Sequence, residues 1–444
     1  MSDLAIFGGP AVIQQPFQRF NEIGAEEEAA VLSVLRSGVL SQFIGVWAPD
    51  FFGGPRVQQL ERQWEKYFQT KHAVAVNSNT SGLMAALGAI GISPGDEVIV
   101  SPWTMSASAT SILVWNAIPV FADIESNTFN LDPVSIEQRI SPRTKAIVVS
   151  DIFGQAADLD AIMKIARKNG LKVIEDCAQA PGARYNNAFV GTIADIGVFS
   201  LNYHKHIHSG EGGVCVTNDT RLFERMQLIR NHAEAVVEAK GVADLDNMIG
   251  FNFRMTEIEA AIASEQLKKL DRIVVDRQNV AERLSAGLKG LRGLSLPFVR
   301  TGCTHVYYVF GMQIDSSETG IHKDQIWEAL RAEGVPVSKR YVNVHLFPMY
   351  QKRVAYGTQG YPWTAPFYSG TVSYEHGTCP VAEDLNENGY LGLGLCVNRY
   401  SNHDVDLIIE AFRKVWINLA ELRAIRFSSA PVSQKELQEV RQTP

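Results

Sequence analysis

Residues 199–219 read FSLNYHKHIHSGEGGVCVTND, and the fold and the function can both be predicted outward from this stretch. The apolar run Ile196–Leu201 predicts one strand, and Val214–Thr217 predicts a second. Between them a polar loop carries Lys205 among three histidines, followed by GEGG, whose glycines permit the positive φ angles of a tight turn. A lysine held between two buried strands is partly buried, which lowers its pKa and makes it a nucleophile toward carbonyl carbon.

A lysine beside a glycine-rich turn is, by itself, usually a solvated loop residue. The preceding segment Lys172–Gly182, KVIEDCAQAPG, gives this lysine a chemical context. Its apolar residues predict a buried strand with Asp176 and Gln179 at the carboxyl end, where open α/β sheets bind ligands. A lysine that forms a Schiff base and an aspartate that keeps a pyridinium nitrogen protonated are what pyridoxal phosphate chemistry requires. The two segments together therefore predict a pyridoxal phosphate site containing Lys205 and Asp176.

The composition excludes several classes of protein. The 444 residues are 46% hydrophobic and 20% charged, with a net charge of −7, which is ordinary for a soluble globular protein and argues against nucleic acid as a partner. No apolar run is long enough to span a membrane, and the N-terminal residues have no signal-peptide pattern, so we expect a cytoplasmic protein. Five scattered cysteines form no CxxC pair, so we expect neither a metal site nor a disulfide framework.

Strand and helix patterns alternate through the first half of the chain. This alternation predicts an α/β fold with a mostly parallel sheet and helices on both faces. We divide the chain into an N-terminal arm with helices, a large cofactor-binding α/β domain, a linking helix, a small C-terminal α+β domain and a tail expected to be disordered. The five parts cover residues 1–60, 61–255, 256–289, 290–428 and 429–444.

Two turns of the large domain are candidate parts of the site. The turn NSNTSG places Thr80 and Ser81 at a helix N-terminus, where hydroxyls, backbone N–H groups and the helix dipole favour a phosphate, although ordinary capping by Asn79 or Thr80 explains the same residues. The turn SPWTMSAS places Trp103 and Met105 at another strand end. One of these two side chains would lie on a flat cofactor ring, and core packing is the alternative for either.

Five segments occur in the order SNTSGL, SPWTMSA, IEDCAQAPGA, FSLNYHKHIHSGEGG and GFNFRMTEIEAA. In this combination they resemble the DegT/DnrJ/StrS family of pyridoxal phosphate-dependent aminotransferases, over roughly residues 5–420. The resemblance implies the type I fold of these enzymes, with a mostly parallel, seven-stranded type of sheet in the large domain and a smaller C-terminal domain. It also implies a homodimer with shared active sites. The chain departs from the family in having Met105 where an aromatic residue is frequent and Asn79 where glycine is common.

The resemblance also implies a role for individual residues. Lys205 would form the Schiff base with pyridoxal phosphate, and Asp176 would bind the pyridine nitrogen. Gln179 would contact the hydroxyl side of the ring. Asn252, in GFNFRMTE, would reach the phosphate of the neighbouring subunit's cofactor. The phosphate of the subunit's own cofactor would be held by Thr80, Ser81 and Ser200.

Three histidines are candidates for substrate contacts. His206 and His208 follow Lys205 in the loop and would tune the site or bind substrate, although loop histidines are more often structural or solvated. His345, in SKRYVNVHLFPMYQ, resembles a family residue near the acceptor sugar. The aromatic segment 351–378 looks like an insertion, and we expect either a lid or substrate wall or a packed surface loop.

The predicted activity is the transfer of an amino group from glutamate or glutamine to a keto sugar or to a keto-cyclitol. Of the keto sugars, a nucleotide-linked one is the favoured acceptor. In this reaction Asp176 stays ionised, and Lys205 moves a proton as general base and acid. A sugar dehydratase of the same fold is one alternative, which Lys205 disfavours because such dehydratases have histidine there. The other alternative is a cofactor-binding regulator without turnover, which is disfavoured because no DNA-binding module precedes the fold.

Overall fold

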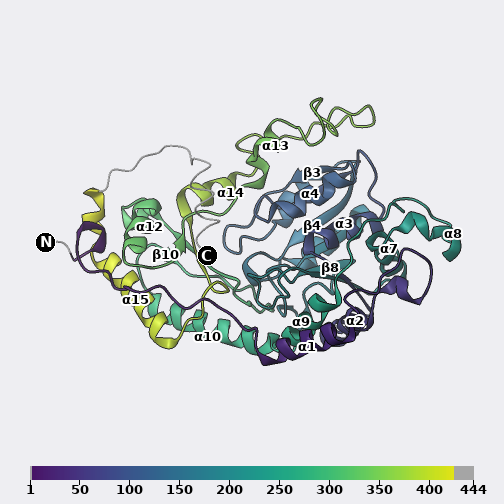
Figure 1. Cartoon of the computed structure of the whole chain (residues 1–444). Helices are drawn as coiled ribbons and strands as arrows, with labels where there is room; N and C mark the ends of the chain where they lie inside the picture. The colour runs from purple at the N-terminus through teal and green to yellow at the C-terminus, as the bar shows by residue number, and fades with distance from the viewer. Residues whose placement is uncertain (1–2, 425–444) are drawn as a thin grey trace.

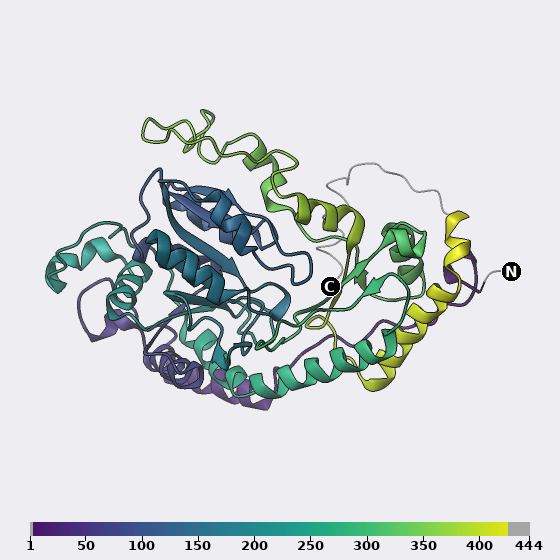
Figure 2. The same ribbon diagram turned by 180° about the vertical axis from the view of Figure 1, so that it is seen from behind.

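The computed structural model describes residues 3–424, so the predicted tail at 429–444 lies outside the described residues. It contains a large part built on a seven-stranded sheet and a smaller part built on a four-stranded sheet. The two parts lie side by side, with the long helix α10 (Leu270–Leu288) running beneath both (Figures 1 and 2).

The large sheet has the strand order β1-β9-β8-β5-β4-β2-β3. The four pairings from β8 to β3 are parallel, whereas β9 pairs antiparallel with both β8 and β1, which confirms the mostly parallel sheet. A separate short hairpin is formed by β6 (Arg184–Tyr185) and β7 (Ala188–Phe189). The strands of the large sheet are β1 (His72–Val76), β2 (Glu97–Val100), β3 (Ile118–Phe121), β4 (Thr144–Ser150), β5 (Lys172–Asp176), β8 (Ile196–Ser200) and β9 (Gly213–Thr217).

Helices cover both faces of this sheet, which explains why its strands are nearly continuous apolar runs. Along β1, Val74 and Val76 face one core and Ala73 and Ala75 face the other, as the pleat of a strand requires. The helices of this part are α1 (Ala25–Ser37), α2 (Pro55–Phe68), α3 (Asn79–Ala89), α4 (Ser106–Val114), α5 (Pro133–Arg139), α6 (Leu159–Asn169), α7 (Thr220–Arg230), α8 (Val237–Lys240) and α9 (Glu257–Leu267).

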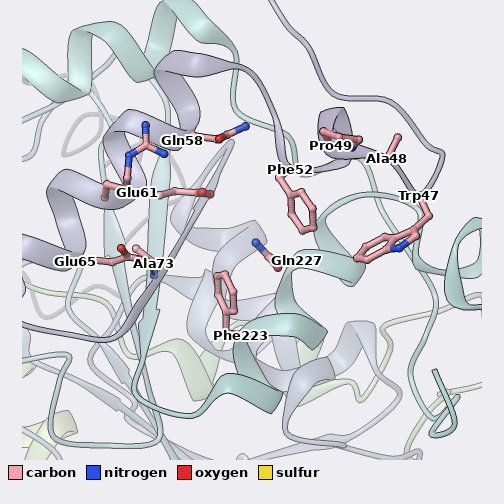
Figure 3. A pocket seen from close by; sticks show the side chains of 11 residues that line it. Trp47, Ala48, Pro49, Phe52, Gln58, Glu61, Glu65, Ala73, Phe223 and Gln227 are labelled. Atoms are coloured by element: carbon pink, nitrogen blue, oxygen red, sulfur yellow. Dashed lines mark hydrogen bonds between the residues drawn. The ribbon is translucent and has the colours of Figure 1, made fainter. Parts of the chain in front are cut away.

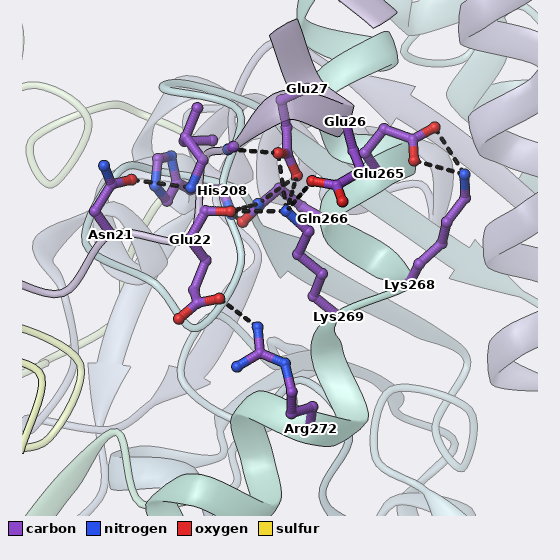
Figure 4. Close-up of polar contacts among 12 residues, drawn as sticks. Asn21, Glu22, Glu26, Glu27, His208, Glu265, Gln266, Lys268, Lys269 and Arg272 are labelled. Carbon is purple, nitrogen blue, oxygen red and sulfur yellow. Dashed lines mark hydrogen bonds and ion pairs between the residues drawn. The ribbon is translucent and has the colours of Figure 1, made fainter. Parts of the chain in front are cut away.

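Two helix boundaries differ from the sequence-based predictions. Helix α3 is capped by Ser78, whose hydroxyl accepts a hydrogen bond from the backbone N–H of Ser81, and not by Asn79 or Thr80. The single linking helix predicted over 256–289 is two helices, α9 and α10, interrupted at Lys268 and Lys269. The ammonium group of Lys269 bonds the backbone carbonyl of Glu22 and the carboxylate of Glu27, which ties this interruption to the chain around the start of α1 (Figure 4).

The smaller part has an antiparallel sheet in the order β10-β11-β13-β12. Its strands are β10 (Leu294–Ser295), β11 (Val309–Ile314), β12 (Val337–Ser338) and β13 (Tyr390–Gly394). The helices that follow α10 are α11 (Ser316–Thr319), α12 (Lys323–Ala332), α13 (Pro348–Gln351), α14 (Pro380–Asp384) and α15 (Asn402–Ile417). Short helical segments complete the described chain: η1 (Ala5–Phe7), η2 (Pro49–Phe52), η3 (Ile152–Gly154), η4 (Ala233–Ala235), η5 (Val344–Leu346), η6 (Leu385–Gly389) and η7 (Leu419–Ala424).

Helix α10 joins the two cores. Its first turns bury Leu270 and Ile273 in the core of the large part, and its last turns bury Leu284 and Leu288 in the core of the smaller part. Because one continuous helix contributes to both cores, their relative position depends on the straightness of α10.

The N-terminal arm belongs to the core of the smaller part. Leu4 and Ile13 are buried there, beside residues of α12 and α15. The Glu333 carboxylate accepts hydrogen bonds from the backbone N–H of Ala5 and of Val12 and pairs with Lys414 at 2.9 Å. The arm is therefore held by a residue more than 300 positions away in the chain.

The aromatic segment 351–378 packs beside the β3 edge of the large sheet (Figure 1). The hydroxyl of Tyr374 donates to the backbone carbonyl of Pro119 on β3 at 2.7 Å, and that of Tyr368 donates to the Glu97 carboxylate at 2.9 Å. These contacts describe a packed loop, the second of the two alternatives expected from the sequence. Among residues 3–424, no helix combines the length and the hydropathy needed to cross a membrane.

Candidate active site

A cavity of about 260 Å³ lies where β4, β5 and β8 end and α3 begins. Open α/β sheets place their ligands at this position, outside the carboxyl ends of the strands. Six of the predicted site residues line it: Thr80, Met105, Asp176, Gln179, Ser200 and Lys205. They come from four separate segments of the chain, and the sheet topology brings them together.

Lys205 lies in the loop between β8 and β9 and is only 8% exposed. Its backbone N–H donates to the carbonyl of Asn202, which closes a turn just before the lysine. At the predicted GEGG turn, Gly210 and Gly212 have positive φ angles of 88° and 151°. Burial lowers the pKa of the Lys205 ammonium group to about 8, and the nearby Asp176 opposes this shift without cancelling it. A substantial fraction of this amine is therefore neutral, and hence nucleophilic, near neutral pH.

Asp176 ends β5 and is held by three donors. The Ser108 hydroxyl donates to it at 2.7 Å, the backbone N–H of Ala178 at 3.2 Å and the side-chain amide of Asn79 at 3.3 Å. Burial raises the pKa of Asp176, whereas these three hydrogen bonds and Lys205 act in the opposite direction. The donors thus stabilise a buried carboxylate that faces the cavity.

Gln179 is fixed at both ends of its amide. Its oxygen accepts from the backbone N–H of Phe153 at 2.8 Å, and its nitrogen donates to the hydroxyl of Tyr341 at 3.1 Å. Both Gln179 and Tyr341 line the cavity. The amide therefore presents a defined edge to whatever occupies the cavity.

The phosphate ligands predicted from the sequence divide into two groups. Thr80 and Ser200 line the cavity, beside the N-terminus of α3. Ser81 is not among the lining residues, and its hydroxyl donates to the Asn77 side chain at 2.5 Å and lies 2.8 Å from that of Ser78. Ser81 therefore acts locally within the turn that begins α3.

The two side chains of the SPWTMSAS turn occupy different places. Met105 lines the cavity and is 60% exposed. Trp103 is fully buried, donates from its indole nitrogen to Asn343 at 2.8 Å and stacks on Phe129, so it does not reach the cavity. Trp103 is therefore a core residue, which is the alternative that the sequence left open for it.

The predicted substrate histidines lie away from the cavity. The ring of His206 is buried and bonds the backbone carbonyl of Val306 at 2.8 Å. The backbone N–H of His208 donates to Gln266, whose amide in turn donates to Glu27 (Figure 4). His345 is buried against Glu383 at 2.7 Å. None of the three is among the residues that line this cavity, whereas His204, which we did not single out, is.

Asn252 lies outside this cavity and is exposed. Its side-chain oxygen accepts from the guanidinium of Arg254 at 2.8 Å. An exposed position is compatible with a contact to a second subunit.

Several lining residues were missed by the sequence analysis. Tyr308 and Tyr341 come from the second half of the chain, where no local pattern marks them. Burial raises the pKa of both tyrosine hydroxyls, Tyr341 to about 12, so both are neutral at physiological pH. Asn79 was noted only as a possible helix cap and as a departure from glycine, yet its amide bonds Asp176.

This set of residues fits pyridoxal phosphate. A buried amine of lowered pKa and a carboxylate with three donors share one cavity, beside a helix N-terminus that favours an anion. Lys205 would hold the cofactor covalently, Asp176 would hold the ring nitrogen, and Thr80 and Ser200 would lie at the phosphate end. The fold and site together define a pyridoxal phosphate-dependent aminotransferase of the type I fold.

The particular family follows from comparison with known proteins. The chain belongs to the DegT/DnrJ/EryC1/StrS aminotransferase family, whose model matches residues 22–387. It is 34% identical to the spore coat polysaccharide biosynthesis protein SpsC of Bacillus subtilis, covering 88% of this chain and 95% of that protein. It is also 34% identical to the L-glutamine:2-deoxy-scyllo-inosose aminotransferase of Streptoalloteichus tenebrarius, covering 80% of this chain and 86% of that protein.

The fold is similarly shared with solved structures. The aminotransferase from Psychrobacter cryohalolentis superimposes with a TM-score of 0.78 at 29% identity, covering 91% of this chain and all of that one. The resemblance predicted from the five segments is thereby confirmed. The aminotransferase assignment is also confirmed, rather than the dehydratase or the regulator considered beside it.

Proposed function

We propose that this aminotransferase moves an amino group from glutamate or glutamine to the keto group of a sugar, nucleotide-linked or free, or of a cyclitol. The observation that carries the proposal is the convergence of Lys205 and Asp176 on one cavity. The names of two relatives support the class of acceptor, since one belongs to polysaccharide biosynthesis and the other aminates an inosose.

The roles of the side chains follow from their surroundings. When bound, pyridoxal phosphate supplies an electron sink that acidifies the α-hydrogen of an amino acid. Asp176, whose carboxylate is stabilised by its three donors, would keep a positive charge at the ring nitrogen. The neutral Lys205 amine removes a proton at Nζ and returns it to a neighbouring carbon, because its pKa of about 8 suits both steps.

The acceptor would meet the wall of the cavity formed by Asn202, His204, Glu211 and Met105. Amide and carboxylate groups of this kind bond hydroxyls as donors and acceptors. The Asn202 amide donates to Glu211 at 2.8 Å, which fixes both groups. Burial lowers the pKa of His204 to about 4, so its ring is neutral and offers one N–H donor and one acceptor nitrogen.

We further infer a cytoplasmic homodimer with shared active sites, in which Asn252 approaches the partner's cofactor phosphate. The exposure of Leu35, Leu40, Val46 and Ile249 supports an interface, because large apolar side chains cluster where subunits meet. Mixing Lys205→Ala with Asn252→Ala protein tests the sharing. A mixed dimer would contain one intact site, so activity should reappear on mixing, whereas separate sites within each subunit would leave the mixture inactive.

A screen of acceptors tests the function itself. Holoenzyme would be incubated with ¹⁵N-labelled glutamate or glutamine and a panel of keto sugar nucleotides, free keto sugars and keto-cyclitols. We expect label in the amine of one acceptor class, detected by mass spectrometry. Label transfer only to simple 2-oxo acids would contradict the proposal while leaving the aminotransferase class intact.

A further inference from the structure

A row of buried hydroxyl groups leads to Asp176. The hydroxyl oxygens of Ser150 and Thr104 lie 2.8 Å apart, and those of Thr104 and Ser108 lie 2.6 Å apart. Ser108 in turn donates to the Asp176 carboxylate at 2.7 Å. Ser150 ends β4 and Asp176 ends β5, whereas Thr104 follows β2 and Ser108 lies on α4. The packing of three neighbouring strands and one helix therefore assembles this hydroxyl row, which consists of Ser150, Thr104 and Ser108.

The charge on Asp176 fixes the direction of these hydrogen bonds. An ionised carboxylate only accepts, so the single hydroxyl proton of Ser108 is used for Asp176. The Ser108 oxygen then accepts from Thr104, and the Thr104 oxygen accepts from Ser150. All three hydroxyl protons thus point along the row toward the carboxylate, and hydrogen bonds aligned in this way polarise and strengthen one another.

The opposite direction leaves a hydroxyl without an acceptor. A protonated Asp176 would donate to Ser108, and the reversed row would end with the Ser150 proton pointing away from Thr104. Within residues 3–424, the Ser150 side chain has no hydrogen-bond partner other than Thr104, and it is only 5% exposed. An unpaired buried hydroxyl costs stability, so the row favours the ionised form of Asp176.

Thr104 holds the row together because it bonds both of the other hydroxyls. A hydroxyl on a helix can instead rotate to donate to a backbone carbonyl one turn earlier, as Thr110 of α4 does to Ser106 at 3.1 Å. The hydrogen bond from Thr104 into the Ser108 oxygen keeps the Ser108 proton on Asp176. This matters because burial raises the pKa of Asp176, which would otherwise favour its neutral form.

The row is separate from a larger cleft near the β1 edge of the large sheet. That cleft has a volume of about 740 Å³ and is walled by the segment around Trp47, by α2 and by α7 (Figure 3). Glu61, Arg62 and Glu65 of α2 all line it, so its charges favour no single class of ligand. It shares no lining residue with the cavity that contains Lys205, whereas Thr104 and Ser150 line that cavity.

We propose that Thr104 is a positioning residue for amino transfer, whose hydroxyl holds Ser108 in the orientation that keeps Asp176 ionised beside the cofactor ring. The inference rests on the proposed function, in which Asp176 binds the ring nitrogen. A carboxylate that stays ionised keeps this nitrogen protonated, and the electron sink of pyridoxal phosphate depends on that proton. Thr104 thereby acts on the chemistry through two intervening side chains.

The experiment replaces the Thr104 hydroxyl by a methyl group in Thr104→Val. Holoenzyme is reconstituted with pyridoxal phosphate that carries ¹⁵N in the ring, and the NMR chemical shift of this nitrogen reports its protonation. In Thr104→Val we expect the signal to move toward the unprotonated value, and cofactor affinity to fall by about threefold to tenfold, as for the loss of one buried hydrogen bond. Thr104→Ser keeps a hydroxyl and should restore both properties.

Thr110→Val is the matched control, because it makes the same substitution on α4 at a hydroxyl outside the row and outside the cavity lining. It should change neither the ring-nitrogen signal nor the cofactor affinity. Ser150→Ala removes the outer end of the row while leaving Thr104 intact, and it should shift the signal in the same direction by a smaller amount. This second variant tests the row even where Thr104→Val folds poorly.

Three outcomes would overturn the proposal. They are an unchanged ring-nitrogen signal in both Thr104→Val and Ser150→Ala, an equal change in Thr110→Val, and a loss that Thr104→Ser does not restore. Neither measurement uses an amino acceptor, so an error in the proposed acceptor class would not affect them. A ring-nitrogen signal that is also unchanged in Asp176→Asn would refute the role of Asp176 itself, and the role of Thr104 with it.

Discussion

The Nζ atom of Lys205 lies 4.5 Å from the centroid of the Tyr308 ring, inside the cavity that also contains Asp176. The ring face and the carboxylate both favour the charged ammonium form. Burial outweighs them and lowers the pKa of Lys205 to about 8. The amine is therefore poised between its charged and neutral forms at physiological pH.

The reactivity of Lys205 in the apoenzyme should follow this titration. Only the neutral amine is nucleophilic, so its modification by trinitrobenzenesulfonate should rise with pH and level off above a midpoint near 8. Mass spectrometry of the peptide containing Lys205 measures the rate. A midpoint near 10.4, the ordinary value for lysine, would contradict the effect of burial. In Tyr308→Leu the midpoint should move to lower pH, because the ring no longer favours the cation.

Replacement of Lys205 should separate chemistry from folding. Lys205→Ala removes the amine that holds the cofactor and moves the proton, so turnover should fall by several orders of magnitude. Its cofactor should be removable by dialysis, and its circular dichroism should match the unaltered protein. Lys172→Ala, at a half-exposed lysine paired with Asp195, provides the control and should retain full activity. Substantial turnover by Lys205→Ala would remove the basis of the assignment.

Ser108 should contribute to cofactor affinity through Asp176. Its hydroxyl donates to the carboxylate at 2.7 Å, and a hydrogen bond to a charged group is worth about 1.5–3 kcal/mol. Ser108→Ala should therefore weaken pyridoxal phosphate binding by roughly tenfold or more, measured by fluorescence titration of the apoenzyme. Ser111→Ala is the matched control, because this hydroxyl on the same helix bonds, among residues 3–424, only the backbone carbonyl of Ser108. Equal affinities for both variants would argue against a role for Ser108.

Trp103 and Met105 should respond in opposite ways to truncation. Trp103→Ala opens a cavity in the core and should lower the free energy of unfolding by about 3–5 kcal/mol. Met105→Ala should change stability little, since the side chain is largely exposed, but should alter the absorption band of the bound cofactor and KM. Denaturant unfolding and visible spectroscopy measure the two effects. A spectral change seen only in Trp103→Ala would instead indicate that the Trp103 indole lies on the cofactor ring.

Much of the large domain could be predicted because its patterns are local. Apolar runs such as Ile196–Ser200 and the capping residues at helix starts act within a few positions, so the alternation of strands and helices was visible in the sequence. Lys205 and Asp176 were found for the same reason, since each follows a strand whose end is fixed by the topology.

The remaining site residues depend on contacts between distant segments. Tyr308 and Tyr341 line the cavity although both follow α10 in the chain. No periodicity in the sequence around them predicts this position. The histidines beside Lys205 show the limit within a single loop. His204 lines the cavity, whereas the ring of His206 bonds the backbone carbonyl of Val306. Which of two nearby loop side chains faces the cavity is decided by tertiary packing.

The attachment of the N-terminal arm bears on how the protein is made. Leu4 and Ile13 leave the ribosome well before the residues that cover them, because α12 and α15 lie hundreds of positions later in the chain. Until then these apolar side chains lack their native partners, which favours chaperone binding and slows folding, as for any topology with distant contacts. A peptide fused directly before Leu4 would crowd this junction, whereas a purification tag joined through a flexible spacer would not.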